Sequence, residues 1–542
     1  MIAALALAAS TALLAAPIAE RPACRCLPSD ASCWPAAAEW AALNASVSGR
    51  LHASVDELDA CLGPTGEEIK SDACWGQLNQ TDDEFWLADQ PNGYQHTGLW
   101  GSEHGAPGPE NEGRSWNTSV LSAYVVHAEA ESDFQATVRF AAKHNLRLVV
   151  KATGHDWYGR SYAPGSLVLW THKRKQMTWH DAFVPAGSAE AGVPAVTVES
   201  GVQFSDMYPA AQATPYPKDP LGRKSIVMGG TCDSVGVGGC WLGGCYGPFT
   251  KKFGNGAINI LEAHVVLANG SLVTCSESQH PDLFWTLRGG GGGNTAVVTE
   301  FTARTHPAPQ YTVSSGFTCK GKDMAGFKAC TKFVLKSSSE AMGWSSAADD
   351  GRGLAVQDCG GGGPSFNSAS FSAGFGCGLQ WEGEPARTAK LYAPLLAWCK
   401  QPAQKALGIS CSSSSSVNWN QSDYTSAHDR FYHTPEYADL KYMPWIELKP
   451  DREISTRMLG SLTKYFPMAG GMDEEEGRES ITDGVTKIDA IVNNLSSTLH
   501  FTNCVMGAKA QSGMSAAMIK AFNNTAQNPV LLNTVGLWLI YL

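Results

Sequence analysis

The sequence of 542 residues has little positive charge and no long internal hydrophobic run. Lysine and arginine total 40 against 51 aspartate and glutamate residues, which gives a formal net charge of -11. A surface of this sign repels phosphate backbones, so we expect no nucleic-acid partner. The apolar stretches at the two ends lack the length or the flanking anchors of a bilayer-spanning helix of roughly 20 residues, so we expect no membrane partner.

Three common motifs are also missing. None of the spacings among the 16 cysteines forms the paired Cys-x-x-Cys clusters of a zinc site, so no metal is expected. No glycine-rich phosphate loop ending in Gly-Lys-Ser/Thr occurs. Gly236-Val-Gly238 is followed by Trp241 where the dinucleotide fingerprint requires a third glycine, so that fingerprint is excluded as well.

The composition that remains is that of a globular protein, with 43% hydrophobic and 17% charged residues. A single hydrophobic core stops growing at about 250–300 residues, so a chain of this length is expected to form two or three packed units. The 56 glycines include several clusters, which indicate places where the backbone approaches another group closely.

The N-terminal region indicates export. Residues 1–19 are apolar and small, and the first charged residue is Glu20, which is typical of a secretory signal peptide although no lysine or arginine lies near Met1. Residues 20–116 read as an extension stapled by disulfides in an oxidising compartment. Its five cysteines are Cys24, Cys26, Cys33, Cys61 and Cys74. Sequons for N-glycosylation occur at Asn44, Asn79, Asn117, Asn269, Asn420, Asn494 and Asn523. We therefore expect a secreted glycoprotein.

Regular structure is predicted from residue 123 onward. Helical spacing of apolar residues predicts a helix over 131–144, with Ser132 as its cap. Apolar runs predict strands, which fall at 123–127, 146–150, 166–171, 195–199 and 294–305. A helix followed directly by an apolar strand indicates α+β or α/β layers.

Later segments are less regular. Residues 260–267 and 272–275 predict a hairpin, because the intervening Asn269-Gly270 suits a primed turn. A short helix is expected over 281–287. Beyond about residue 307 helix and strand signals are mixed, which indicates a second domain. Low-complexity loops are predicted there at 360–363 and 412–416. The apolar end, 530–542, is too short to span a bilayer and reads as a core element.

Two glycine-bearing turns carry the chemistry. Residues 151–161 follow a predicted strand, where successive backbone N–H groups can bind an anion such as phosphate. Residues 229–247 have small or absent side chains, so their backbone could lie flat against a large planar ligand. Taken alone, each turn is better explained as a plain connection between strands. By itself His155 is more often a structural histidine, and Cys232 is more often part of a disulfide.

Their order along the chain is more specific. Lys-x-x-Gly-His-Asp-x-x-Gly-Arg-Ser at 151–161, Trp170-Thr-His172, and Thr-Cys-Asp-Ser-Val-Gly-Val-Gly-Gly at 231–239 resemble the FAD-linked oxidases of the vanillyl-alcohol oxidase superfamily. The most similar branch is the berberine bridge enzyme-like group, including the fungal isoamyl alcohol oxidase type. The resemblance implies an α+β fold with a two-subdomain FAD-binding PCMH-type domain at 117–308. An α+β substrate domain would follow at 309–542.

The resemblance also implies roles for single residues. His155 matches the histidine that bonds covalently to the 8α methyl of FAD, and Cys232 matches a cysteine that bonds the ring a second time in some members. Single and double attachment both stay open. Val235 matches a position where valine is associated with oxygen access. The other residues expected to cradle the pyrophosphate or lie along the cofactor are Ala152, Thr153, Gly154, Asp156, Ser161, Gly230, Gly236, Gly238 and Val298.

The expected protein is thus a secreted FAD-dependent oxidoreductase. A small-molecule alcohol, amine or carbohydrate would transfer hydride to the flavin, with molecular oxygen as acceptor and hydrogen peroxide as product. No motif singles out a catalytic base. The family's closing Tyr-x-Asn segment does not occur before Leu542, so we expect the substrate domain to be truncated at its C-terminus. The alternatives are a flavin-binding protein without turnover and a dehydrogenase that uses another acceptor.

Overall fold

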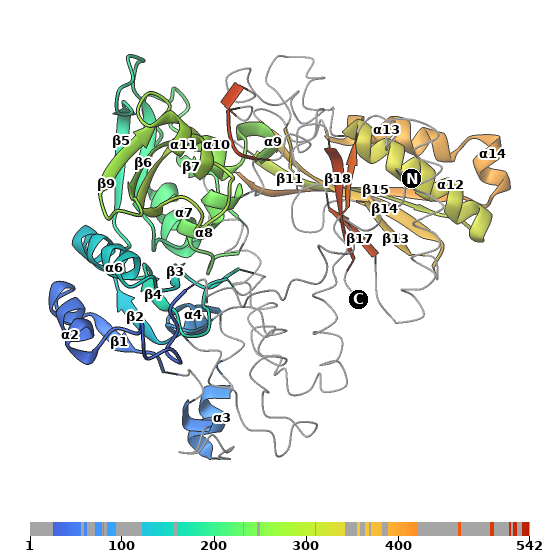
Figure 1. Cartoon of the computed structure of the whole chain (residues 1–542). Helices are drawn as coiled ribbons and strands as arrows, with labels where there is room; N and C mark the ends of the chain where they lie inside the picture. The colour runs from blue at the N-terminus through green and yellow to red at the C-terminus, as the bar shows by residue number, and fades with distance from the viewer. Residues whose placement is uncertain are drawn as a thin grey trace, which may run out of the picture.

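The structure is a computed structural model of the chain, and its described residues form two lobes (Figure 1). The first lobe carries the elements up to β10, and the second carries a large sheet with three helices. The described residues are 25–55, 59–61, 71–78, 80, 84–93, 122–156, 160–230, 232–245, 250–308, 311–341, 355–357, 364–367, 370–381, 388–420, 464–467, 499–502, 520–521, 524–527 and 534–540. The domain boundaries given above stay predictions.

A four-stranded sheet opens the first lobe. Its strand order is β1-β2-β4-β3, in which β2 and β3 run parallel to β4 and β1 runs antiparallel to β2. The bounds are β1 (Leu51–Ala53), β2 (Tyr124–His127), β3 (Leu148–Lys151) and β4 (Leu167–Trp170). Helix α6 (Glu131–Lys143) connects β2 to β3, as parallel strands require. The three predicted strands and the predicted helix are confirmed, and the carboxyl ends of the parallel strands meet at one edge.

The predicted cap of α6 is wrong. The helix begins at Glu131, so Ser132 lies inside its first turn and Ala130 takes the N-cap position. Asp133 satisfies the helix start, because its carboxylate accepts from the backbone N–H groups of Glu129 and Ala130 at 2.9 Å each. The same buried carboxylate pairs with the half-buried Arg50 at 2.6 Å, and this ion pair favours Asp133 over a serine hydroxyl.

The N-terminal segment joins the first lobe directly. Helix α2 (Ala37–Ser46) packs Trp40, Leu43 and the following Val47 into the same core as Phe134 and Val138 of α6. The other elements are η1 (Asp59–Cys61), α3 (Asp72–Leu78) and α4 (Glu84–Ala88).

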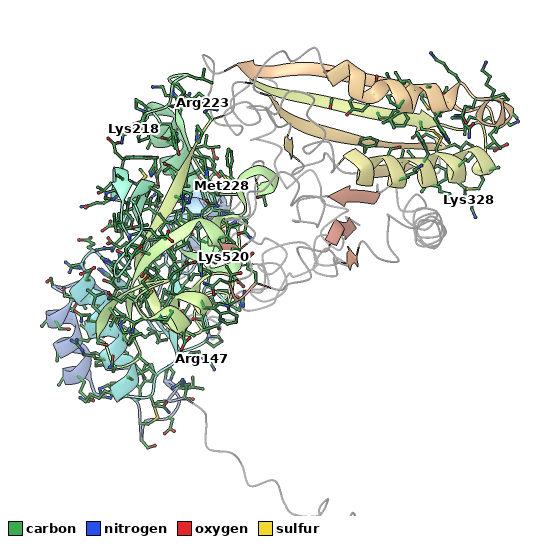
Figure 2. All side chains as sticks on the ribbon, turned by 90° about the horizontal axis from the view of Figure 1, so that it is seen from above. Arg147, Lys218, Arg223, Met228, Lys328 and Lys520 are labelled. Atoms are coloured by element: carbon green, nitrogen blue, oxygen red, sulfur yellow. A yellow bond between two sulfur atoms is a disulfide. The ribbon has the colours of Figure 1, made fainter. Side chains whose placement is uncertain are left out.

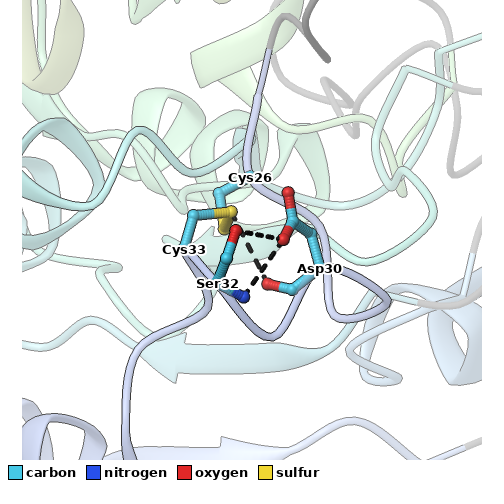
Figure 3. Close-up of a disulfide and its surroundings, with 4 residues drawn as sticks. All are labelled: Cys26, Asp30, Ser32 and Cys33. Carbon is cyan, nitrogen blue, oxygen red and sulfur yellow. Dashed lines mark hydrogen bonds between the residues drawn. A yellow bond between two sulfur atoms is a disulfide. The ribbon is translucent and has the colours of Figure 1, made fainter.

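Two disulfides staple the N-terminal segment, Cys26–Cys33 and Cys61–Cys74, as expected. Figure 3 shows the first of them with Asp30, whose carboxylate accepts from the Ser32 hydroxyl at 2.6 Å and fixes the turn. The remaining expectations for this region lie outside the described residues, namely the leader at 1–19, Cys24, Asn79 and Asn117; the sequons at Asn494 and Asn523 do as well.

An antiparallel sheet forms the second half of this lobe, with strand order β5-β6-β10-β8-β9 and β7 paired to β10. The strands are β5 (Met177–Phe183), β6 (Val193–Glu199), β7 (Ser225–Val227), β8 (Ile260–Val266), β9 (Leu272–Ser276) and β10 (Val297–Pro307). Its helices are α7 (Phe204–Ala213), α8 (Val237–Cys240), η4 (Trp241–Gly243), α9 (Thr250–Phe253), α10 (Gly256–Asn259) and α11 (Pro281–Leu287). Phe204, Trp241, Phe284 and Phe301 fill the core beneath one sheet face.

The hairpin β8–β9 is confirmed, but its predicted primed turn is wrong. Residues 267–271 join the strands, and only Gly270 among them has positive φ, at 77°, whereas a primed type I turn needs two such residues. The Gly270 carbonyl accepts from Gln135 and Arg139 of α6 at 2.9 and 2.7 Å. These bonds pin the turn to the first sheet and so join the two halves of the lobe.

The second lobe is an eight-stranded antiparallel sheet of order β15-β11-β14-β13-β17-β18-β16, with β12 paired to β14. The strands are β11 (Tyr311–Lys320), β12 (Ala355–Gln357), β13 (Pro364–Asn367), β14 (Ser372–Trp381), β15 (Ser410–Asn420), β16 (Lys464–Pro467), β17 (Leu499–Thr502) and β18 (Thr534–Ile540). Helices α12 (Met324–Ala341), α13 (Thr388–Cys399) and α14 (Pro402–Ala406) lie along one side of the sheet (Figure 1). No helix in the described part of the chain is long and apolar enough to cross a membrane.

One loop prediction in this lobe is wrong. Residues 412–416 belong to β15, where they pair with residues 314–318 of β11, and the predicted loop at 360–363 lies outside the described residues. Serine has a weak preference for strands, but pairing along β11 and the Cys399–Cys411 disulfide hold the segment in the sheet. Within the apolar end of the chain, residues 534–540 form β18, which pairs with β17 and β16.

Candidate functional site

The turn that follows β3, residues 152–156, is called the histidine turn here. The Trp170 indole N–H donates to the Ala152 carbonyl at 2.9 Å, and Thr153 is buried. Gly154 has φ of 91°, a left-handed conformation that disfavours any residue with a Cβ. The turn is therefore held at the carboxyl edge of the parallel strands, where ligands of α/β sheets commonly bind.

The second glycine turn, residues 230–236, is called the thiol turn here. Helix α7 fixes it, because the backbone N–H groups of Phe204 and Ser205 donate to the carbonyls of Val235 and Asp233 at 3.1 and 2.9 Å. The side-chain amide of Gln203, directly before α7, donates to the Ser234 carbonyl at 2.9 Å. The start of helix α7 thus fixes the position of the thiol turn through these hydrogen bonds.

The two turns meet at Ser234. Its hydroxyl oxygen lies 2.8 Å from His155 Nε2 and 3.3 Å from Cys232 Sγ. A second bond joins the turns, from the Gly236 backbone N–H to the Thr153 hydroxyl at 3.0 Å. The structure thus places the imidazole and the thiol, which lie in separate turns of the sequence, around a single buried hydroxyl.

The glycines of the thiol turn, and Gly238 of α8 directly after it, have a packing reason of their own. A Cβ on Gly236 would lie 3.1 Å from the Ala152 side chain, and one on Gly238 would lie 2.5 Å from the Ser200 carbonyl oxygen. A Cβ on Gly230 would lie 3.3 Å from the Phe204 ring. These glycines allow the turns and α7 to pack closely, a requirement that holds whether or not a ligand lies on the other side.

The remaining predicted residues are spread around the turns. Val298 is buried in β10, and Val235 is half-buried against the same core. Ser161 is buried beyond the histidine turn. The Asp156 carboxylate pairs with Arg160, four residues further along the chain, at 2.6 Å, so its charge is offset locally. That pairing suits an anion site, because an unpaired carboxylate would repel phosphate.

The cysteines of the site differ in chemical state. Cys232 is half-buried and carries a thiol, as does buried Cys275 of β9, whereas Cys240 and Cys245 form a disulfide. Burial raises the pKa of the Cys275 thiol to about 12, so this sulfur stays protonated and unreactive. Among the described cysteines, Cys232 is the half-buried thiol that lies beside the histidine turn.

Sequence reasoning missed the polar groups that surround the strand edge. The buried Lys151 ammonium donates to the carbonyls of Gln90 and Pro91, which ties the segment after α4 to β3. His172 Nε2 lies 2.8 Å from the Asp89 carboxylate, and burial lowers the pKa of His172 to about 4. His172 Nδ1 is buried and has no partner among the described residues. Trp170-Thr-His172 marked this edge in the sequence, but nothing marked Asp89.

A segment near the chain end also returns to the first lobe. The Arg288 guanidinium donates to the Asn524 carbonyl, and the Ala526 N–H donates to the Arg288 carbonyl at 3.0 Å. The Gln527 side chain hydrogen-bonds Asn255 at the start of α10. Figure 2 shows Lys520 beside the first lobe, whereas Lys328 lies on the second. Residues 524–527 do not contain the Tyr-x-Asn motif. They contact the turn that follows α11 through these hydrogen bonds.

A cavity of about 460 Å³ lies apart from these turns, on the N-terminal segment. Its lining includes His52, Trp86, Gln90 and His127, and none of the predicted site residues. Burial lowers the pKa of His127 to about 4, so this imidazole is neutral. No group of three or more metal-ligating side chains occurs within the described ranges.

An imidazole and a thiol thus converge beside a glycine turn at the carboxyl edge of the parallel strands. Residues 122–276 match the family described as FAD binding domain. The chain is 36% identical over 303 residues to the FAD-linked oxidoreductase easE of Claviceps fusiformis, covering 54% of this chain and 50% of that protein. The chain thus spans about half the length of the curated relatives it matches.

Solved structures extend the comparison to both lobes. The VAO-type flavoprotein MtVAO615 of Myceliophthora thermophila C1 superposes with a TM-score of 0.70 at 22% identity, covering 96% of this chain and 83% of that one. Berberine bridge enzyme of Eschscholzia californica gives 0.53 at 14%, covering 93% and 80%. The chain has the fold of the VAO-type flavoproteins, and its residues 122–276 match an FAD-binding domain, as its sequence motifs predicted.

Proposed function

We propose that this protein is an FAD-dependent oxidoreductase that holds FAD between the histidine turn and the thiol turn. The observation that carries the proposal is the convergence of His155 and Cys232 on the Ser234 hydroxyl, at 2.8 and 3.3 Å. The FAD-binding domain over 122–276 and the FAD-linked oxidoreductases among the relatives support it.

Each part of the site suits one part of the cofactor. Backbone N–H groups at 153–156 would bind the pyrophosphate, and left-handed Gly154 lets the chain turn sharply around it. His155 would hold the flavin ring covalently, and Cys232 is placed to form a second bond. The small side chains of the thiol turn, with Val298 behind them, would lie along the ring. The Asp156–Arg160 pair adds no net charge beside the phosphates.

Bound FAD would supply the redox chemistry, accepting hydride from a substrate C–H and passing the electrons to molecular oxygen, which leaves as hydrogen peroxide. The residues of this chain orient the ring, and Val235 beside Cys232 sets the access of oxygen to it. We propose an alcohol, amine or carbohydrate as substrate. The second lobe, whose helices and sheet follow the FAD-binding domain, would cover the ring and select that substrate.

We also propose that the protein works outside the cell. Five disulfides lie within the described residues, in both lobes, and such bonds persist in oxidising compartments. The apolar leader at 1–19 supports the same location.

The test is the redox behaviour of the purified full-length chain. The protein should be yellow, should lose its blue absorption when an anaerobic substrate panel of alcohols, amines and sugars is added, and should regain it in air with release of peroxide. A colourless protein would contradict the flavin site. A reduced form that persists in air but reacts with a dye would identify a dehydrogenase and overturn the role of oxygen.

A further inference from the structure

Ser234 is the shared partner of the two proposed attachment residues. Its hydroxyl contacts both His155 and Cys232, and the side chain is 1% exposed, so water does not compete for these bonds. A hydroxyl has one proton to donate and two lone pairs. It can therefore accept from one neighbour and donate to the other at the same time.

We propose that Ser234 is a positioning residue that joins the His155 imidazole and the Cys232 thiol into one proton-sharing unit. The inference rests on the proposed flavin site, since it concerns the residues assigned there as attachment points. It goes further, because it makes the reactivity of the thiol depend on the histidine of the other turn.

The unit has two arrangements with the same number of protons, which differ by the net transfer of one proton from Cys232 Sγ to His155 Nε2. In the first, the Cys232 S–H donates to the Ser234 oxygen and the Ser234 O–H donates to His155 Nε2. In the second, the S–H bond has broken and an O–H bond has formed, while the original O–H has broken and an N–H bond has formed at Nε2. The sulfur is then a thiolate and the imidazole is an imidazolium. No electrons are transferred, so the step needs no oxidant.

The backbone around Ser234 keeps this geometry. The Gln203 amide N–H donates to the Ser234 carbonyl at 2.9 Å, and the Gln203 amide oxygen accepts from the Lys175 ammonium at 2.6 Å. The Gly236 N–H bond to Thr153 fixes the other side of the turn. The serine is held from two directions, so its hydroxyl lies between the imidazole and the thiol without rearrangement.

The charged groups around the unit are mostly paired among themselves. Asp156 of the histidine turn pairs with Arg160, and Lys175 pairs with Asp206 of α7 at 3.0 Å. The Tyr208 hydroxyl of α7 donates to the Gly230 carbonyl. Asp233 is buried directly after Cys232, and a carboxylate there disfavours a lone thiolate. An imidazolium formed in the same step offsets that charge, which is why the thiol needs the histidine.

The experiment compares full-length wild type with Ser234→Ala, Ser234→Thr and the matched control Ser200→Ala. Ser200 is buried in the same lobe, and its hydroxyl has no partner among the described residues. Peptide mapping measures the fraction of Cys232 that carries flavin, and iodoacetamide alkylation from pH 5 to 10 measures any thiol that remains. The unfolding midpoint of each variant is recorded alongside.

For Ser234→Ala we expect the flavin-linked fraction of Cys232 to fall roughly five-fold or more. The remaining thiol should be alkylated roughly five-fold more slowly at pH 7, with its profile displaced to higher pH. Ser234→Thr keeps the hydroxyl, so both its flavin-linked fraction and its alkylation rate should stay within about two-fold of wild type. Ser200→Ala should match wild type in both measurements. His155→Ala should slow alkylation like Ser234→Ala, and the double variant should be no slower, because both changes break the same relay.

The proposal is overturned if Ser234→Ala matches wild type in both measurements, or if Ser234→Thr behaves like Ser234→Ala at an unchanged unfolding midpoint. A wild-type chain without any flavin would contradict the proposed function but not this inference. In that case Cys232 is wholly a thiol, and its alkylation profile alone decides between the outcomes.

Discussion

Two polar regions of the first lobe differ in the charge state of their histidines and in how their polar side chains are paired. On the face of the antiparallel sheet away from α7 and α11, His264 lies 3.4 Å from Glu262 and 2.8 Å from Glu300, and Arg174 pairs with Glu199 at 2.7 Å. Hydrogen bonds to Glu262 and Glu300 raise the pKa of His264 to about 10. This group, Arg174, Glu199, Glu262, His264 and Glu300, is called the ionic face.

The strand edge is built differently. His172 and His127 are kept neutral by burial, with pKa values of about 4, and each has a buried ring nitrogen without a partner among the described residues. His155 lies against a neutral hydroxyl. The ionic face offsets its charges within the chain, so it can stabilise the sheet unaided. The strand edge instead keeps two imidazoles neutral by burial, and His155 there contacts the Ser234 hydroxyl.

The comparison predicts that changes at the strand edge alter the flavin and that changes on the ionic face alter stability. The largest effect is expected for His155→Ala. Acid-stable flavin should fall by roughly twenty-fold or more, because the covalent link is lost, while the unfolding midpoint of the flavin-free chain changes little. Flavin absorbance of the acid-precipitated protein measures it. Retention of acid-stable flavin at the wild-type level would show that His155 is not its sole attachment point.

Gly154→Ala should lower both the flavin content and the stability of the fold. Its φ of 91° costs an alanine about 1–2 kcal/mol, and the strain displaces the histidine turn. Gly49→Ala is the matched control, since Gly49 has φ of 82° with open space around it and lies far from the site in sequence. Both variants should lose similar stability in urea, but only Gly154→Ala should lose flavin, roughly five-fold. Equal flavin contents would show that the turn does not need its shape.

The ionic face should appear as a pH-dependent stability. The folded pKa of His264, about 10, lies above the unfolded value near 6.5, so its stabilisation is complete below pH 6.5, declines above it and is gone above about 10. We expect about 1–2 kcal/mol after solvent screening is allowed for. His264→Gln should remove this part of the pH dependence and keep its flavin. Parallel stability curves for the two proteins between pH 6 and 10 would refute the assignment.

The smallest effect is expected for Asp89→Asn. An asparagine oxygen can still accept from His172, and the Asp89 side chain is 60% exposed, so stability should change by less than about 0.5 kcal/mol. Flavin content should be unchanged. Urea unfolding and the flavin spectrum provide the measurement, and a loss above about 1.5 kcal/mol would mean that the carboxylate holds the strand edge together.

The sequence was sufficient where local patterns determine structure. The helix over 281–287 agrees with the structure to the residue, and the strands that were predicted up to β10 agree to within a few residues, because alternation and helical spacing record which face is buried. Strands β5 and β7 were not predicted. It failed at residues 412–416, where pairing with β11 overrides the weak strand preference of serine. It failed at Ser132 too, because the Arg50–Asp133 pair is a tertiary contact.

Contacts between segments far apart in the sequence also limited the prediction of the site. Resemblance singled out His155 and Cys232, each in its own turn, but not the residue that joins them. Ser234 has no unusual sequence context, and its contact with His155 spans 79 positions. The Lys151 bonds to Gln90 and Pro91 likewise connect a strand to a segment 60 positions away. Side-chain contacts of this kind depend on how the turns pack, which no local pattern records.

The central claim is that the histidine turn and the thiol turn enclose one FAD, and peptide mapping of the acid-precipitated wild-type protein tests it most directly. The account predicts a flavin adduct on the peptide that contains His155, with Cys232 either in the same adduct or recovered as a thiol. Flavin attached to some other peptide, or Cys232 recovered in a disulfide, would contradict it.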